Sequence, residues 1–297
     1  MSAQSEESTG YEFLSIPSSA HSAALGGSAV SLAEDDASLL FINPALMCNV
    51  SDRTLMLNYT SYISGTMKLG AVFTKKAGER GTMAFGAQLL NYGEMTETNS
   101  SRQEIGTFTA NDIAVQGGYT YLLGERWSGG VQAKALFSSY GSYSSVALGV
   151  DLGLNYYDAE GGWSASLVGQ NLGGQIDPLY DVAQALPFHL AFGISKELAD
   201  APLRVHFSLP DITHWQKEFF YNMNIGVDIF PSSQTWLAVG YNPLRAAEMR
   251  TGTDDKSHGA GLSFGGGLSV KRFKLGLSYA KYHVASSSIL VNASFSF

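Results

Sequence analysis

Apolar and polar residues alternate with a period of two in segment after segment between Thr54 and Phe297. Successive side chains of a β-strand point to opposite faces, so this period predicts strands that are apolar on one face only. The alternating segments are 54–62, 65–75, 81–92, 107–122, 126–140, 143–157, 162–170, 187–198, 202–210, 219–230, 234–242, 258–270, 272–282 and 286–297.

The number and length of these segments favour a membrane barrel over a soluble sheet protein. Bacterial outer-membrane barrels have an even number of antiparallel strands, and a tilted strand of about 9–11 residues crosses the bilayer. A soluble sandwich or barrel would also alternate, because one face would pack against a core. The second face here consists mostly of Gly, Ser, Ala and Asn, however, and carries few Lys or Glu to keep a soluble surface hydrated. The predicted fold is all-β: a transmembrane antiparallel β-barrel of about fourteen strands with a short N-terminal plug segment that contains a short helix.

The turns are predicted to alternate between short and long. The segments 61–66 and 270–273 leave little room, whereas 92–107, 173–187 and 242–259 are long and polar. In outer-membrane barrels the short turns face the periplasm and the long loops face outward. The segment 211–218 reads as a short helical turn or an outer loop, and its side is left open. Aromatic residues near the strand ends are predicted to form girdles at the lipid–water interface: Tyr59, Tyr62, Tyr92, Tyr121, Trp127, Tyr156, Tyr157, Trp163, Trp236, Tyr241 and Tyr282.

Composition agrees with a lipid-embedded barrel. Charged residues make up 15% of the 297 residues, against roughly 25% in an average soluble protein. No stretch of about 18 consecutive apolar residues offers a transmembrane helix. The net charge of −8 argues against nucleic acid as a partner, because phosphate binding needs clustered Lys and Arg. With one cysteine, no intrachain disulfide is possible.

Residues 1–53 differ from the rest of the chain. Residues 1–10 are expected to be the end of a cleaved signal peptide, of which Ser2-Ala-Gln looks like the small-residue end, and the start of the mature chain. Residues 11–53 are small and mostly neutral, which suits a plug inside the lumen of a barrel that spans 54–297. Asp35 or Asp36 is expected to cap a short helix over 37–41, and Pro44 to end it.

The N-terminal motifs resemble a known family. These motifs are Tyr11-Glu-Phe-Leu-Ser-Ile-Pro-Ser-Ser-Ala, Ala24-Leu25-Gly26-Gly27, Asp35-Asp36-Ala-Ser-Leu and Asn43-Pro44-Ala45-Leu, with support from Gln170-Asn-Leu-Gly-Gly. Together they resemble the PorV/PorQ family, outer-membrane components of the type IX secretion system that are related to the FadL-like barrel superfamily. The Asn-Pro-Ala element is shared with FadL-type transporters, so it is only moderately specific.

The resemblance implies a role without catalysis. Proteins of this family work with PorV, the sortase-like PorU and PorZ in a cell-surface attachment complex, which removes a C-terminal signal from cargo and links the cargo to lipopolysaccharide. The barrel would anchor that complex in outer-membrane lipid, with a PorZ-like surface protein as its partner. The alternative is a FadL-like channel for hydrophobic small molecules, although the loops here are shorter than such channels usually have.

The last segment ends on alternating aromatic residues. Phe295 and Phe297 are predicted to form the signal that the barrel-assembly machinery recognises, and the last strand is expected to pair with the first. An ordinary edge strand that ends on Phe by chance is the other interpretation.

No enzyme is predicted. His206 and Ser208 share one strand face, as in outer-membrane phospholipases. Catalysis would also need a third group to orient the imidazole and an oxyanion donor. Both side chains are expected to point inward, away from lipid, so His206 is interpreted as a packed lumen histidine. The glycines of 259–267 lie within a strand, where they suit barrel curvature or plug contact better than a dinucleotide site. The six scattered histidines indicate no metal site, and no cofactor is predicted. Cys48 is interpreted as a free thiol.

Overall fold

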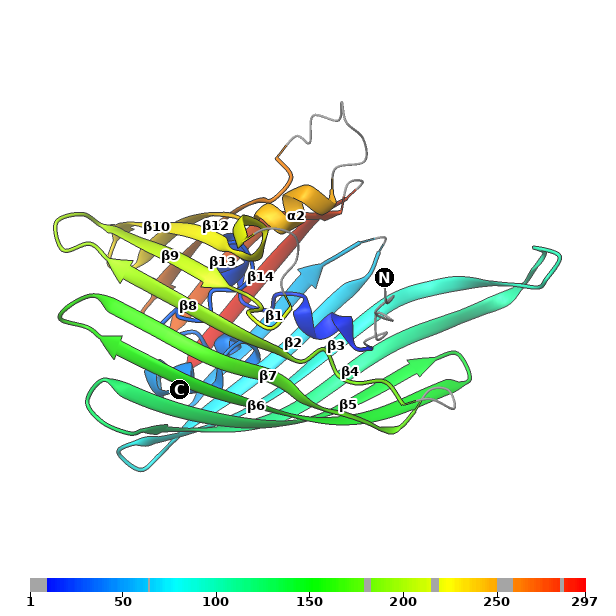
Figure 1. Cartoon of the computed structure of the whole chain (residues 1–297), viewed down its shortest axis with the longest axis horizontal. Coiled ribbons are helices and arrows are strands. Elements are labelled where there is room, and N and C mark those ends of the chain that lie inside the picture. Colours follow the sequence, from blue (N-terminus) through cyan, green and yellow to red (C-terminus); the bar gives the residue numbers. More distant parts are fainter. Residues whose placement is uncertain (1–9, 64, 179–182, 215–218, 250–258, 284–285) are drawn as a thin grey trace, which may run out of the picture.

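The strands of the computed structural model form one closed antiparallel barrel (Figure 1). The structure describes residues 10–63, 65–178, 183–214, 219–249, 259–283 and 286–297. Within these residues each of fourteen strands pairs with its sequence neighbours, and β1 pairs with β14 to close the sheet. The strands are β1 Thr54–Ser61, β2 Met67–Ala77, β3 Gly81–Thr98, β4 Glu104–Leu122, β5 Trp127–Tyr140, β6 Tyr143–Asp158, β7 Trp163–Asp177, β8 His189–Glu197, β9 Leu203–Leu209, β10 Asn224–Ser232, β11 Thr235–Tyr241, β12 Leu262–Val270, β13 Phe273–His283 and β14 Ser286–Ser296.

The predicted fold class is therefore confirmed, and the differences lie at the strand ends. The segment predicted as a strand from 219 begins as a 3₁₀ helix, η4 (Phe219–Asn222), and β10 starts only at Asn224. β12 starts at Leu262 because Gly259 and Gly261 adopt positive φ angles of 72° and 84° and form a turn. The beginning of that predicted segment, residue 258, lies outside the described residues.

The alternation separates a lipid-facing surface from a lumen-facing one. In β1, buried and exposed residues alternate without a break from Thr54 to Thr60. The exposed positions of the barrel carry large apolar side chains, such as Leu57 and Phe85, which are each 54% exposed. Such an outward apolar band is what the hydrocarbon core of a bilayer requires of a barrel.

The aromatic girdles are confirmed for some residues and wrong for others. Trp127 and Trp163 lie on the outer face, 46% and 42% exposed. Trp236 instead points into the lumen and stacks on His21, and the Tyr92 hydroxyl donates to the inward carboxylate of Asp112. Position near a strand end predicts a girdle only when the alternation also places the ring outside.

The two ends of the barrel differ in their connections. At the end where Thr54 pairs with Ser296, consecutive strands are joined by two to five residues. The opposite end holds the long connections β7–β8, β9–β10 and β11–β12. Residues 211–214 of the segment 211–218 therefore lie at that end, and 215–218 lie outside the described residues. Two expectations were wrong. The turn 61–66 lies at the long-loop end, and 92–107 is mostly an extension of the β3–β4 hairpin, because strand pairing continues to Thr98 opposite Glu104.

The short helices of the described residues lie in the N-terminal segment and in the long connections. Among the described residues, no helix has both the length and the hydropathy needed to cross a bilayer. The largest buried apolar cluster is built from the N-terminal segment and the wall that surrounds it, with Leu39, Leu40 and Leu46 fully buried. The helices are η1 Glu12–Ser15, α1 Ala20–Ala24, η2 Ala37–Phe41, η3 Pro44–Asn49, η4 and α2 Pro243–Glu248.

Candidate functional site

Residues 10–53 fill the lumen and form a plug (Figure 1, blue). The plug is tied to the wall by hydrogen bonds along its length. Lys68 on β2 donates to the carbonyl groups of Phe13, at 3.2 Å, and Ile16, at 2.5 Å. Asn292 on β14 donates to the carbonyl of Ser18 at 2.9 Å. Because its polar backbone groups are satisfied by wall side chains, the segment can lie inside the barrel without the desolvation cost of an unpaired chain.

The motif residues 24–27 end helix α1 and press against the wall. Gly26 and Gly27 have φ angles of 105° and 109°, which favour glycine, and the Gly27 N–H donates to the Ser22 carbonyl at 2.9 Å. Ala24 and Leu25 are buried. Glycines in the barrel wall leave room for them.

The motif residues 43–45 hold the plug together and attach it to the barrel wall. The Asn43 side chain accepts from the Ala45 N–H at 2.9 Å and donates to the Val30 carbonyl at 2.9 Å, so it both starts η3 and ties two stretches of the plug together. Pro44 is the first residue of η3 and does not end η2, which stops earlier at Phe41. Ser128 on β5 donates to the Ala45 carbonyl at 2.9 Å.

The two adjacent aspartates have different partners. Asp36 caps η2 by accepting from the Ser38 N–H at 2.8 Å, and also accepts from the Ser19 hydroxyl at 2.7 Å. Burial, together with the charge of Glu34, raises the pKa of Asp36. Asp35 instead pairs with Lys274 on β13 at 2.5 Å and accepts from the Ser51 N–H at 2.7 Å. Burial alone would raise the pKa of Asp35, but these hydrogen bonds and the lysine charge outweigh it and lower the pKa.

A buried charge cluster joins the plug to β9 and β10. Asp228 on β10 contacts the His21 Nε2 at 2.7 Å, the Arg204 Nη2 at 2.7 Å and the His206 Nε2 at 2.8 Å. Glu34 contacts the other nitrogen of His21 at 2.8 Å. The His21 ring stacks on Trp236, with 3.7 Å between the ring centroids. Both imidazole nitrogens therefore face carboxylates, which favours the doubly protonated cation.

The pH dependence of stability follows from His21. Burial lowers its pKa, but the charges of Glu34 and Asp228 and the hydrogen bonds to them outweigh burial and raise the pKa to about 9. Its folded-state pKa thus lies above the ordinary value of 6.5, so its stabilising contribution is full below pH 6.5 and is lost as pH rises through about 9. We expect the urea midpoint of the folded barrel to fall between pH 7 and 10, and the His21→Phe variant, which keeps a ring on Trp236, to show a smaller fall. An equal fall in both proteins would contradict the assignment.

A second polar cluster lies on the wall formed by β4 to β7. Lys134 contacts Asp151 at 2.8 Å and donates to the Asn171 side chain at 2.7 Å. Gln132 donates both to Gln116, at 2.6 Å, and to Asp151, at 2.9 Å. Asn171 has a φ angle of 60° at a register shift between β6 and β7, a left-handed conformation that Asn tolerates better than most residues. The bulge turns the Asn171 side chain toward Lys134.

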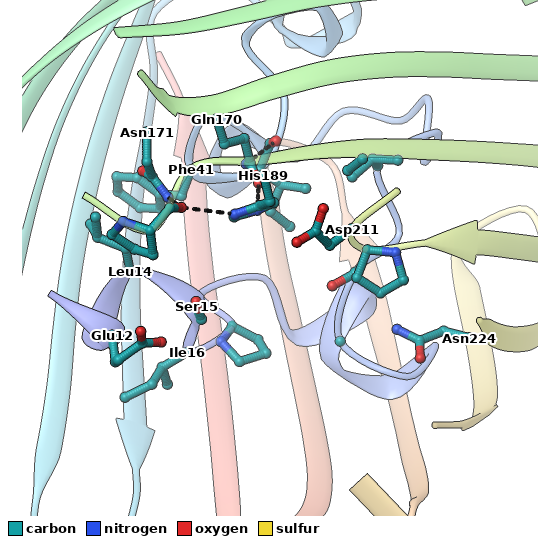
Figure 2. A pocket seen from close by; sticks show the side chains of 18 of the residues that line it. Glu12, Leu14, Ser15, Ile16, Phe41, Gln170, Asn171, His189, Asp211 and Asn224 are labelled. Carbon is teal, nitrogen blue, oxygen red and sulfur yellow. Dashed lines mark hydrogen bonds between the residues drawn. The ribbon is translucent and has the colours of Figure 1, made fainter. Parts of the chain in front are cut away.

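A cavity of about 1390 Å³ lies next to this cluster, between the first turn of the plug and the connections at the long-loop end (Figure 2). Its wall includes the apolar side chains of Leu14, Ile16 and Phe41. Gln116, Lys134 and other polar residues supply the rest. It exceeds the roughly 300–1,000 Å³ of most small-molecule pockets.

Sequence reasoning placed some of these residues and missed others. His206 and Ser208 are buried and point inward, as expected, and His206 contacts Asp228. The expectation of a weakly charged inner face was wrong, because the buried Lys68 and Lys134 and the partly buried Arg204 all lie on it. The alternation already predicts that these three residues face the lumen, since each stands in phase with the small inward-facing residues of its strand. Phe295 and Phe297 are exposed at the short-turn end, with ring centroids 5.1 Å apart. Cys48 is a free, partly buried thiol, and burial raises its pKa.

Solved outer-membrane channels have a similar fold. The toluene transporter TodX of Pseudomonas putida matches with a TM-score of 0.55 at 13% identity, over 94% of this chain and 96% of its own. The CymD monoaromatic hydrocarbon channel matches with a TM-score of 0.59 at 14% identity, over 95% and 98%. A FadL homologue of Pseudomonas aeruginosa matches with a TM-score of 0.52 at 12% identity, over 94% and 98%. No protein-family profile and no curated protein matches the sequence. At these identities the comparisons establish a FadL-like barrel fold.

Proposed function

We propose that this chain is an outer-membrane channel that receives small hydrophobic molecules in the cavity above its plug. The cavity carries the proposal: it lies inside a barrel with an apolar outer face, its walls carry apolar side chains beside polar ones, and it is large enough for a small organic molecule. The neighbours in fold support it, because they include a toluene transporter and a monoaromatic hydrocarbon channel. Charged and hydrogen-bonded groups fix the plug.

The β3–β4 hairpin favours a second candidate function. Its strands have 18 and 19 residues, about twice what crossing a bilayer requires. It projects beyond the other strands (Figure 1, right), and Glu97, Glu104 and Ile105 are exposed on it. A projecting hairpin suits contact with a surface protein. The motifs of residues 11–47 resemble the PorV/PorQ family, whose members belong to the attachment complex of the type IX secretion system. In this reading the barrel anchors a PorZ-like protein and the PorU/PorV complex.

One deletion strain separates the two proposals. We expect loss of the chain to lower the initial uptake rate of radiolabelled toluene while uptake of a hydrophilic sugar and anchoring of secreted proteins stay normal. The matched control is the deletion strain that carries the intact chain on a plasmid. Normal toluene uptake together with secreted cargo released into the medium would reject the channel and support the anchoring role.

A further inference from the structure

Two amide groups in the cavity wall lack hydrogen-bond acceptors. The Nε2 atom of Gln116 on β4 and the Nδ2 atom of Asn224 on β10 are buried and have no partner among the described residues. Both residues line the cavity and are at least nine-tenths buried, at 4% and 3% exposure. Leaving a buried donor unpaired costs about 1–3 kcal/mol. An apolar channel would have no reason to keep such groups in its wall.

The two donors face the cavity from different strands. Figure 2 shows Asn224 reaching in from one side, across the cavity from Leu14 and Ile16. Gln116 stands opposite Lys134 in the β4–β5 register, but the Lys134 ammonium reaches away from β4 to Asp151 on β6 and Asn171 on β7. The Gln116 oxygen is already engaged by Gln132 at 2.6 Å, which leaves the N–H groups as its free side. The result is one amide donor on the β4 wall and a second amide donor on the β10 wall.

The charge of the cavity selects the kind of acceptor. Both amide donors are uncharged, and Lys134, which also lines the cavity, is neutralised by Asp151 at 2.8 Å. Asp211 and Glu248 also line the cavity and repel anions. A neutral oxygen can therefore accept from these donors, whereas a carboxylate would be desolvated without a free cation to balance it.

We infer that the cavity binds uncharged amphiphiles, molecules with an apolar chain and a carbonyl or ether oxygen, in preference to bare hydrocarbons or fatty acids. The oxygen accepts from Gln116 or from Asn224, and the chain packs against Leu14, Ile16 and Phe41. This inference rests on the proposed channel function and narrows its substrate class.

Calorimetric titration of the full chain in lipid nanodiscs tests the inference, with empty nanodiscs as the blank. The probes are 2-dodecanone, dodecane and dodecanoate. For the unaltered protein we expect 2-dodecanone to bind about tenfold more tightly than dodecane, and dodecanoate most weakly, because one recovered hydrogen bond is worth that order. Gln116→Leu and Asn224→Leu should each reduce the preference for the ketone, and Gln234→Leu, in an exposed turn outside the cavity, should leave it unchanged.

The outcomes are separable. Gln116→Glu keeps the acceptor for Gln132 but removes the amide donors. If Gln116→Leu assembles poorly, Gln116→Glu takes its place and should show the same reduced preference for the ketone. Equal binding of ketone and alkane by the unaltered protein would overturn the inference and leave the channel proposal standing. Binding of none of the three probes would reject both.

Discussion

Replacing Gly130 by valine is expected to displace the plug more often and so to make conducting openings of the barrel more frequent. Gly130 lies on β5 and faces the lumen, where a Cβ would lie only 2.8 Å from the Ala45 Cα and close to the backbone of Pro44. These are backbone atoms, so they cannot yield by a rotamer change. Overpacking of this kind costs about 1–3 kcal/mol, which raises the population of the displaced plug by roughly tenfold.

Single-channel recording in planar bilayers measures this effect. The unaltered barrel should open rarely, and Gly130→Val should open roughly tenfold more often or more, in line with the shift in plug population. Gly117→Val is the matched control: it lies on the neighbouring strand β4, and its Cβ would meet the Phe85 ring at an ordinary 3.5 Å. A folded Gly130→Val barrel with unaltered conductance would show that residues 43–45 do not close the lumen.

The barrel itself was largely predictable because lipid on one side and a packed lumen on the other impose strict alternation. A one-residue slip would turn every apolar side chain inward, so the register is specified by the sequence. The errors arose where the alternation stops, as at Gly259–Gly261 and at η4. The β3–β4 hairpin was predicted too short because its outer part is solvated on both faces and loses the apolar signal.

The site was much less predictable. Alternation shows that Lys134 and Asp228 face inward, but not which plug residue each will meet, because those contacts join positions far apart in the chain. The Asp228–His21 contact spans 207 residues. Asp36 was one of two expected helix caps, since capping is local, whereas the Asp35–Lys274 pair depends on the closed barrel. Trp236 was misassigned although the alternation places it in phase with the inward-facing Ala238 and Gly240; only its contact with His21 depends on the plug.

Replacing Asp228 by asparagine is expected to cause the largest loss of stability in the chain. Asp228 is fully buried and contacts His21, Arg204 and His206. Without its charge, the cationic His21 and Arg204 share only Glu34, so one positive charge stays buried without a counterion. Removing one partner of a buried ion pair costs about 3–5 kcal/mol. Because His21 belongs to the plug, the loss should fall first on the contact between the plug and the β9–β10 wall.

Two measurements distinguish this local loss from general destabilisation. Urea unfolding followed by tryptophan fluorescence should show a lower midpoint for Asp228→Asn than for Asp200→Asn, whose side chain lies exposed in the β8–β9 turn. Limited proteolysis of the folded barrel should cut residues 18–34 faster in Asp228→Asn, because α1 loses its charged anchor. Equal midpoints for the two variants would mean that the cluster contributes no net stability. Unchanged proteolysis with a lowered midpoint would place its effect in the wall, between β9 and β10, where Arg204 and Asp228 pair independently of the plug.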